Sequence, residues 1–78
     1  MLIGLQIRCG RFALRWSVKD LAGRSRVSIS TIKRIEIEDG IPHPTAANLA
    51  ALKAALEPEG IEFIGTPDDG PGIRFRQL

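Results

Sequence analysis

The sequence predicts a mainly α-helical domain of four helices, followed by a β-hairpin or a pair of short strands. Apolar residues recur at intervals of three and four up to about residue 56, which is the spacing of amphipathic helices. Hydroxyl residues that favour helix N-termini precede three of these segments. Beyond "EPEG", the stretches "IEFI" (61–64) and "IRFR" (73–76) alternate between apolar and polar residues, and the turn-rich "GTPDDGPG" separates them. The chain therefore changes from helical to extended structure near residue 60.

The first two helices follow from this periodicity and from one capping signal. The first is expected from about Ile3 to Leu14, with one side formed by Leu5, Arg8, Cys9 and Phe12. The pattern then breaks at "RWS". Ser17 with Asp20 three residues later resembles a capping box, so a short second helix is expected from Val18 to about Arg24.

The third and fourth helices have similar starting signals. Ser28 is expected to cap a third helix that runs to about Ile37, and Thr45 to cap a fourth, "AANLAALKAAL". In the third helix, Ile32 and Ile35 share the side that faces the core at 100° per residue. The opposite half contains a β-branched apolar residue, a short hydroxyl and two cations, with no acid: Ile29, Ser30, Lys33, Arg34 and Ile37. In the fourth, the apolar stripe consists of Leu49, Leu52 and Leu56.

Size and composition limit the possible functions. The 78 residues can form one compact core, but not a core together with a deep enzymatic cleft. One cysteine, Cys9, allows no internal disulfide, and with His43 alone it makes no zinc site. The sequence has no apolar run of membrane-spanning length, no nucleophile motif and no phosphate-binding glycine loop. We expect a cytoplasmic protein without cofactor or metal that is not an enzyme.

Charge is distributed unevenly along the chain. Residues 1–34 have eight basic residues against one acid, for a net charge of +7. Residues 35–78 have three against eight, for a net charge of −5. Such a division suggests that the first half meets a polyanion.

The segment "WSVKDLAGRSRVSISTIKRIE" carries a resemblance to a known family. It resembles the helix-turn-helix of phage lambda repressor and Cro-like (Xre-type) DNA-binding domains, in which a Leu-Ala pair, three apolar positions and a Ser-x-x-Thr-Ile-x-x-Ile-Glu stretch recur. The matching residues are Leu21-Ala22, Val27, Ser28, Thr31, Ile32, Ile35 and Glu36. The resemblance implies a four-helix lambda repressor-like domain over residues 1–57. Residues 58–78 would form a C-terminal β extension.

The resemblance has two further implications for the first half. It implies a buried or half-buried ion pair between Glu36 and Arg11. It also marks a departure, because the turn position that is normally Gly holds Arg26. A left-handed residue there costs about 1 kcal/mol or more without glycine. Either stability is lost in exchange for a cation near phosphate, or the turn has a different shape.

If residues 28–37 form a recognition helix in the DNA major groove, its outward residues meet base edges. Arg34 could then bond guanine, Ile29 could contact a thymine methyl group, and Lys33 and Ser30 could bond a base or a phosphate. Contacts to phosphate are expected from the ends of the second helix and the start of the third, with Arg15 adding charge alongside: Ser17, Lys19, Arg24, Arg26 and Ser28.

The apolar residues of the hairpin suggest self-association. A two-stranded hairpin is marginal alone, so a homodimer interface is expected to include Ile61, Phe63, Ile73 and Phe75. The alternative is a strand pair that folds back on its own core. The resulting function is a dimeric, sequence-specific regulator of transcription, such as a repressor, acting on double-stranded DNA near a bacterial or phage nucleoid. The alternative is a protein-interaction module on the same fold, such as an antitoxin or an anti-activator.

Overall fold

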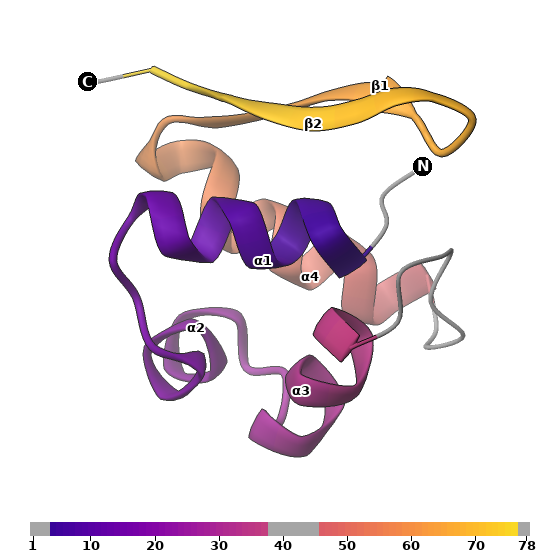
Figure 1. Ribbon diagram of the computed structural model, residues 1–78. Helices are drawn as coiled ribbons and strands as arrows, with labels where there is room; N and C mark the ends of the chain where they lie inside the picture. The colour runs from indigo at the N-terminus through magenta and orange to yellow at the C-terminus, as the bar shows by residue number, and fades with distance from the viewer. Residues whose placement is uncertain (1–3, 38–45, 77–78) are drawn as a thin grey trace.

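The computed structural model describes residues 4–37 and 46–76. It is mainly helical and ends in an antiparallel β-hairpin, as predicted (Figure 1). The elements in chain order are α1 (Gly4–Ala13), α2 (Val18–Ser25), α3 (Ile29–Ile37), α4 (Ala46–Leu56), the short 3-10 helix η1 (Glu57–Glu59), β1 (Ile61–Thr66) and β2 (Asp69–Phe75). Among the described helices, none is long and apolar enough to cross a membrane. The predicted cap Thr45 lies outside the described residues.

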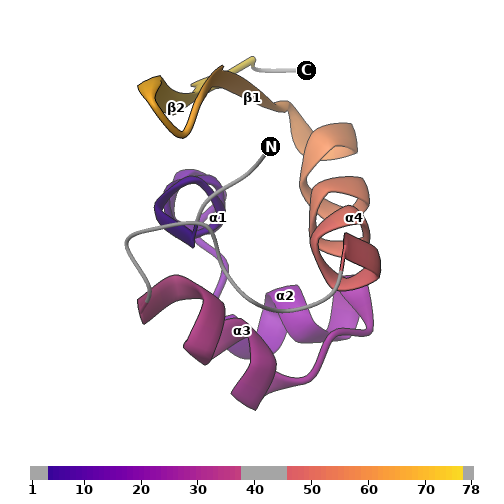
Figure 2. The same cartoon turned by 90° about the vertical axis from the view of Figure 1, so that its right-hand side faces the viewer.

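Helix α1 lies between two layers. The hairpin covers one side of it, and α2 and α3 lie on the other (Figure 1). Turned by 90°, the molecule shows α4 alongside these layers, with its C-terminal end leading into the hairpin (Figure 2). The enclosed core draws on all four α-helices, the turn before α3 and β1, and consists of Ile7, Leu21, Val27, Ile32, Ile35, Leu52, Leu56 and Ile61.

The buried side of α1 differs from the predicted stripe. Leu5 is 38% exposed and Phe12 is 63% exposed, so this pair does not face the core. Instead α1 buries Ile7 together with two polar side chains, Gln6 and Arg11. Spacing within the helix could not reveal this side, because it carries polar groups whose partners lie far away in sequence.

The hairpin turns one face toward α1. Its register pairs Ile61 with Phe75 and Phe63 with Ile73, which places these four side chains on the same face. Ile61 is buried in the core, and Phe63 and Ile73 pack against it. Phe75 remains half exposed. The strand pair thus folds back on its own core, which is the alternative named above, and the dimer interface expected at these four side chains stays a prediction.

Gln6 fastens the hairpin to α1. Its buried side-chain amide donates hydrogen bonds of 2.9 Å to the carbonyl oxygens of Ile64 and Gly72, a cross-strand pair. One residue farther along the chain lies a bulge, where two residues of β2 stand opposite Gly65. One side chain of α1 thus holds both strands just before the sheet becomes irregular.

A glycine at the start of the hairpin provides a test of this packing. Gly60 has φ 101°, and a Cβ atom there would collide with the carbonyl oxygen of Arg76. We expect Gly60→Ala to lower the free energy of unfolding by more than about 1 kcal/mol. In Gly23→Ala, where a Cβ meets nothing within 4 Å, we expect a gain of up to about 1 kcal/mol from helix propensity. Urea unfolding measures both, and equal effects of the two substitutions would contradict the prediction.

Candidate nucleic-acid interface

Helix α2 begins with the predicted capping box. The Ser17 hydroxyl oxygen accepts from the Asp20 backbone N–H at 3.0 Å, and the Asp20 carboxylate accepts from the Ser17 N–H at 2.9 Å. These bonds hold the pKa of the Asp20 carboxyl below its ordinary value, chiefly through the Ser17 N–H. A serine hydroxyl has one donor and two acceptor sites, so Ser17 can cap the helix and still donate outward. Lys19, in the same turn, is exposed.

The turn between α2 and α3 is left-handed at Arg26. This residue has φ 63° and ψ 18°, and its N–H bonds the carbonyl of Ala22 at 2.8 Å. Beside it, the Ser25 hydroxyl donates to Leu21 O and accepts from Val27 N–H. The backbone thus takes the left-handed shape for which glycine is usual although arginine occupies the position, so the alternative of a differently shaped turn does not apply.

Helix α3 separates an apolar side from a basic one. Ser28 caps it, because its hydroxyl oxygen accepts from Thr31 N–H at 3.2 Å. Ile32 and Ile35 are fully buried. The opposite half lies open to solvent and bears no acidic side chain: Ile29, Ser30, Lys33, Arg34 and Ile37. The four residues predicted to contact bases are therefore exposed side by side on one helix.

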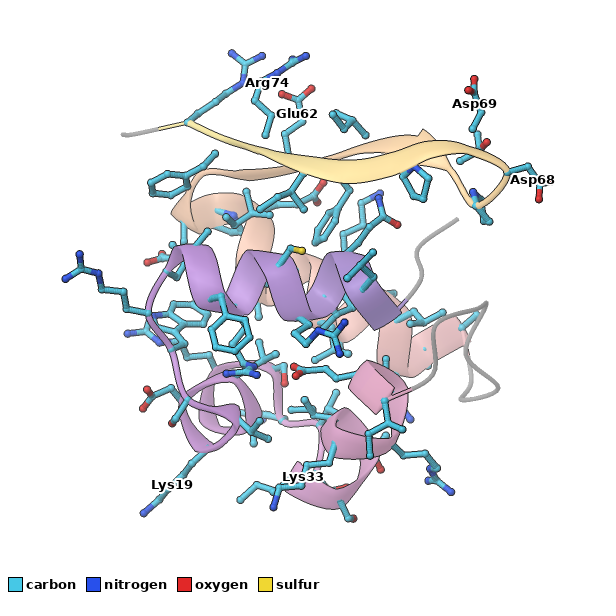
Figure 3. All side chains as sticks on the ribbon, in the orientation of Figure 1. Lys19, Lys33, Glu62, Asp68, Asp69 and Arg74 are labelled. Atoms are coloured by element: carbon cyan, nitrogen blue, oxygen red, sulfur yellow. The ribbon has the colours of Figure 1, made fainter. Side chains whose placement is uncertain are left out.

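Helices α2 and α3 present their lysines on the same side of the molecule. Lys19 and Lys33 both extend from the end opposite the hairpin (Figure 3). The labelled acids of the hairpin, Glu62 and Asp68 among them, lie at the far end. These hairpin acids thus lie away from the basic surface that α2 and α3 form.

Two residues predicted to contact phosphate have partners within the chain. The Arg24 guanidinium stacks on the Trp16 ring, 4.4 Å from its centroid. Ser28, besides capping α3, bonds the Thr31 hydroxyl at 2.7 Å. Arg24 keeps the edge of its guanidinium and its charge while stacked, because the ring contacts only the face of the group. Trp16 itself packs against the core.

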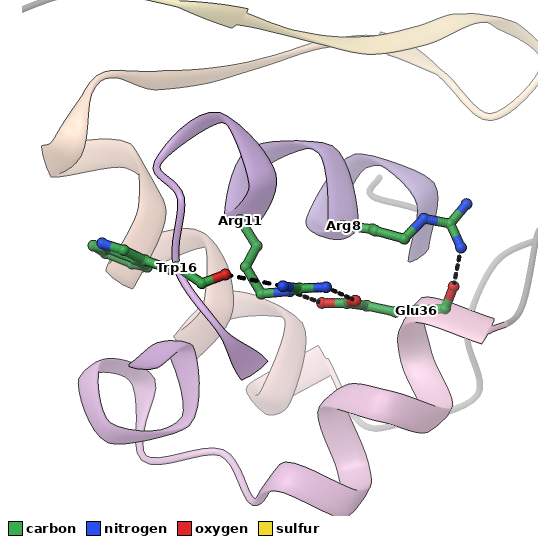
Figure 4. Close-up of polar contacts among 4 residues, drawn as sticks. All are labelled: Arg8, Arg11, Trp16 and Glu36. Carbon is green, nitrogen blue, oxygen red and sulfur yellow. Dashed lines mark hydrogen bonds and ion pairs between the residues drawn. The ribbon is translucent and has the colours of Figure 1, made fainter. Parts of the chain in front are cut away.

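The structure brings Arg11 and Glu36 together as a buried, two-pronged ion pair (Figure 4). Arg11 Nε and Nη2 each donate to one carboxylate oxygen of Glu36 at 2.8 Å. Its third nitrogen, Nη1, donates to the Trp16 carbonyl at 2.9 Å, and the Phe12 ring lies 4.5 Å from the guanidinium carbon. The hydrogen bonds to Glu36 raise the pKa of the Arg11 side chain, so the guanidinium stays charged.

Arg8 also belongs to this region, although the sequence predicted no contact between it and the third helix. Its Nη1 donates to the backbone carbonyl of Glu36 at 3.1 Å, near the C-terminal end of α3 (Figure 4). Carbonyls in the last turn of a helix lack intrahelical partners, and a cation there also complements the helix dipole. Arg8 lies three residues before Arg11, one helical turn away, which is the signal that could have revealed it.

Comparison of the chain with protein-family models, with curated proteins and with solved structures finds no match in any of the three. The case for a nucleic-acid interface therefore rests on the residues of this chain alone. It unites an exposed basic side of α3, the capped start of α2 and the turn between them. The Arg11–Glu36 pair holds α3 to α1 behind this surface.

Removal of Glu36 tests the ion pair. Glu36→Ala leaves the Arg11 charge buried and unpaired, so we expect the free energy of unfolding to fall by about 3–5 kcal/mol. The double variant Arg11→Met with Glu36→Leu should lose less, because no charge remains buried. Glu57→Ala removes an exposed i,i+4 pair with Lys53 and should cost at most about 0.5 kcal/mol. Denaturant unfolding measures the free energy of unfolding of each variant. A double variant less stable than Glu36→Ala would refute this account.

Proposed function

We propose that this chain is a sequence-specific, double-stranded DNA-binding regulator of transcription of the lambda repressor/Cro-like, Xre-type kind. The observation that carries the proposal is the exposed side of α3, which combines two cations, a hydroxyl and an apolar side chain without an acid. A solvated helix surface commonly mixes acids with bases, whereas a helix in the major groove benefits from this set. In this reading α2, the turn and α3 form a helix-turn-helix, with α3 as the recognition helix.

The proposed docking assigns each exposed group a task. Arg34 bonds guanine at two atoms, Ile29 contacts a thymine methyl group, and Ser30 and Lys33 bond bases or phosphate. Lys19 and Ser17, at the positive end of the α2 dipole, contact a phosphate. The fold favours this arrangement, since Lys19 and Lys33 extend on the same side (Figure 3). The acids of the hairpin lie at the opposite end, away from the DNA.

We further propose that the protein acts as a homodimer through the hairpin edges. The inner side chains of the hairpin serve the chain's own core, so pairing would use backbone groups along the free edge of a strand. Antiparallel pairing of two copies has its two-fold axis normal to the sheet. Because α1 and then α2 and α3 lie beneath the sheet, both recognition helices would face the same way (Figures 1 and 2).

Two substitutions separate base reading from phosphate binding. Arg34→Ala should cost about 1–3 kcal/mol of specific affinity and relax the preference at one base position. Lys19→Ala should weaken all sequences alike and flatten the dependence of log affinity on log salt by about 0.9. Fluorescence anisotropy of labelled random and selected duplexes, titrated at several salt concentrations, measures both. If neither variant changed binding, the docking would be incorrect, and a wild-type chain that binds no duplex would favour a protein-interaction module.

The proposed dimer is tested by measuring the mass of the protein in solution and on DNA. Static light scattering of the free protein and of its DNA complex should give a protein mass twice the 8.5 kDa of one chain. In the complex, the selected sequence should contain half-sites whose centres lie about 34 Å apart. A single chain on an asymmetric site would contradict the proposed dimer and leave DNA binding intact.

A further inference from the structure

Two arginines adopt a backbone conformation that L-residues rarely take. Among the non-glycine residues in the described ranges, those with positive φ are Arg15, at 60°, and Arg26, at 63°. Each follows the end of a helix, where its N–H completes a turn: Arg15 N–H bonds Phe12 O at 2.9 Å, and Arg26 N–H bonds Ala22 O at 2.8 Å. Glycine is the usual residue at such positions, and asparagine the next choice. Arginine has no conformational reason to occupy either.

No contact within the described part of the chain stabilises these two side chains. Both are exposed, and neither takes part in a hydrogen bond, ion pair or ring contact there. Most other described arginines have such a partner: Arg8, Arg11, Arg24, Arg74 and Arg76. The strain at Arg15 and Arg26 is thus uncompensated by any side-chain contact among residues 4–37 and 46–76. Uncompensated strain of this kind concentrates where a ligand is bound.

The two arginines bracket α2. Arg15 lies two residues before its cap, Ser17, and Arg26 lies immediately after its last residue. The eight residues of α2 span about 12 Å, so the two arginines start from opposite ends of the helix. The one acid of α2, Asp20, is committed to the capping box and does not neutralise either of them. A planar guanidinium is the side chain best matched to the oxygens of a phosphate.

We infer that Arg15 and Arg26 each bind a phosphate of the DNA backbone and that the fold gives up stability to keep them; this rests on the function proposed above. The two contacts fix α2 at both of its ends, so the phosphate-binding surface extends along the whole helix. Stability and affinity are then opposed at these positions. A substitution that relieves the backbone must weaken DNA binding.

Glycine substitutions test the inference because they remove the strain and the charge together. For Arg15→Gly and Arg26→Gly, we expect the melting temperature to rise by about 4 °C each, since relief of the left-handed backbone outweighs the added freedom of the unfolded chain. The slope of log affinity against log salt should become shallower by about 0.9 in each variant and by about 1.8 in the double variant. Thermal unfolding and fluorescence anisotropy with a duplex of random sequence measure the two quantities.

Three matched variants isolate the cause. Gly23→Ala should raise the melting temperature without changing charge, so its slope should equal that of the wild type. Arg74→Gln removes one charge from the hairpin, at the end opposite Lys19 and Lys33, and should also leave the slope unchanged (Figure 3). Arg26→Lys keeps both charge and strain, so its slope and melting temperature should stay close to those of the wild type.

The outcomes separate this inference from the function on which it rests. If the wild type binds duplex DNA with a steep slope and the glycine variants keep that slope, the inference is overturned and the proposed function stands. If the glycine variants lose stability, the left-handed arginines serve the fold, and the inference is again overturned. If the wild type binds no duplex, the proposed function fails and takes the inference with it. Higher melting temperature with a shallower slope supports both.

Discussion

The arrangement of the helices depends on the buried pairing of Arg11 with Glu36. Arg11 uses three nitrogens to join α1 to α3 and to the Trp16 carbonyl in the connection to α2. A charge pair sheltered from water tolerates little displacement, because any shift would leave a charge unsolvated and unbonded. The orientation of α3 relative to α1 is therefore fixed more narrowly than apolar packing alone would fix it. The exposed basic side of α3 has a defined direction as a result.

The hairpin supplies an apolar side chain to the core of the helices and hydrogen-bond acceptors to α1. Ile61 adds to the core of the helices, and it packs so close to α1 that a Cβ on Gly10 would lie 3.2 Å from it. Gln6 satisfies its amide protons on the same two strands. A 78-residue chain has little apolar surface to spare, so a satellite hairpin that joins the main core is an economical solution.

Local signals in the sequence were sufficient for much of this fold, and long-range contacts account for the rest. The Ser17–Asp20 capping box, the Ser28 cap and the two sides of α3 depend on residues within one helical turn of each other, so their spacing predicted them. The inward side of α1 could not be predicted in the same way. Gln6 is buried because of strand carbonyls 58 and 66 residues away, and spacing carries no such information. The Arg11–Glu36 pair was expected from family resemblance and not from periodicity.

The same long-range contacts bear on how the chain becomes ordered during synthesis. Helix α1 is synthesised before the hairpin, yet Ile7 and Ile61 belong to one core. Until β1 and β2 have emerged, the two strand carbonyls that accept from Gln6 are missing and one side of α1 has no cover. A nascent chain that has reached only the end of α4 thus exposes apolar surface, which is the condition that chaperones recognise. Folding of this unit is accordingly completed by the hairpin, even though the surface proposed to meet DNA is made much earlier.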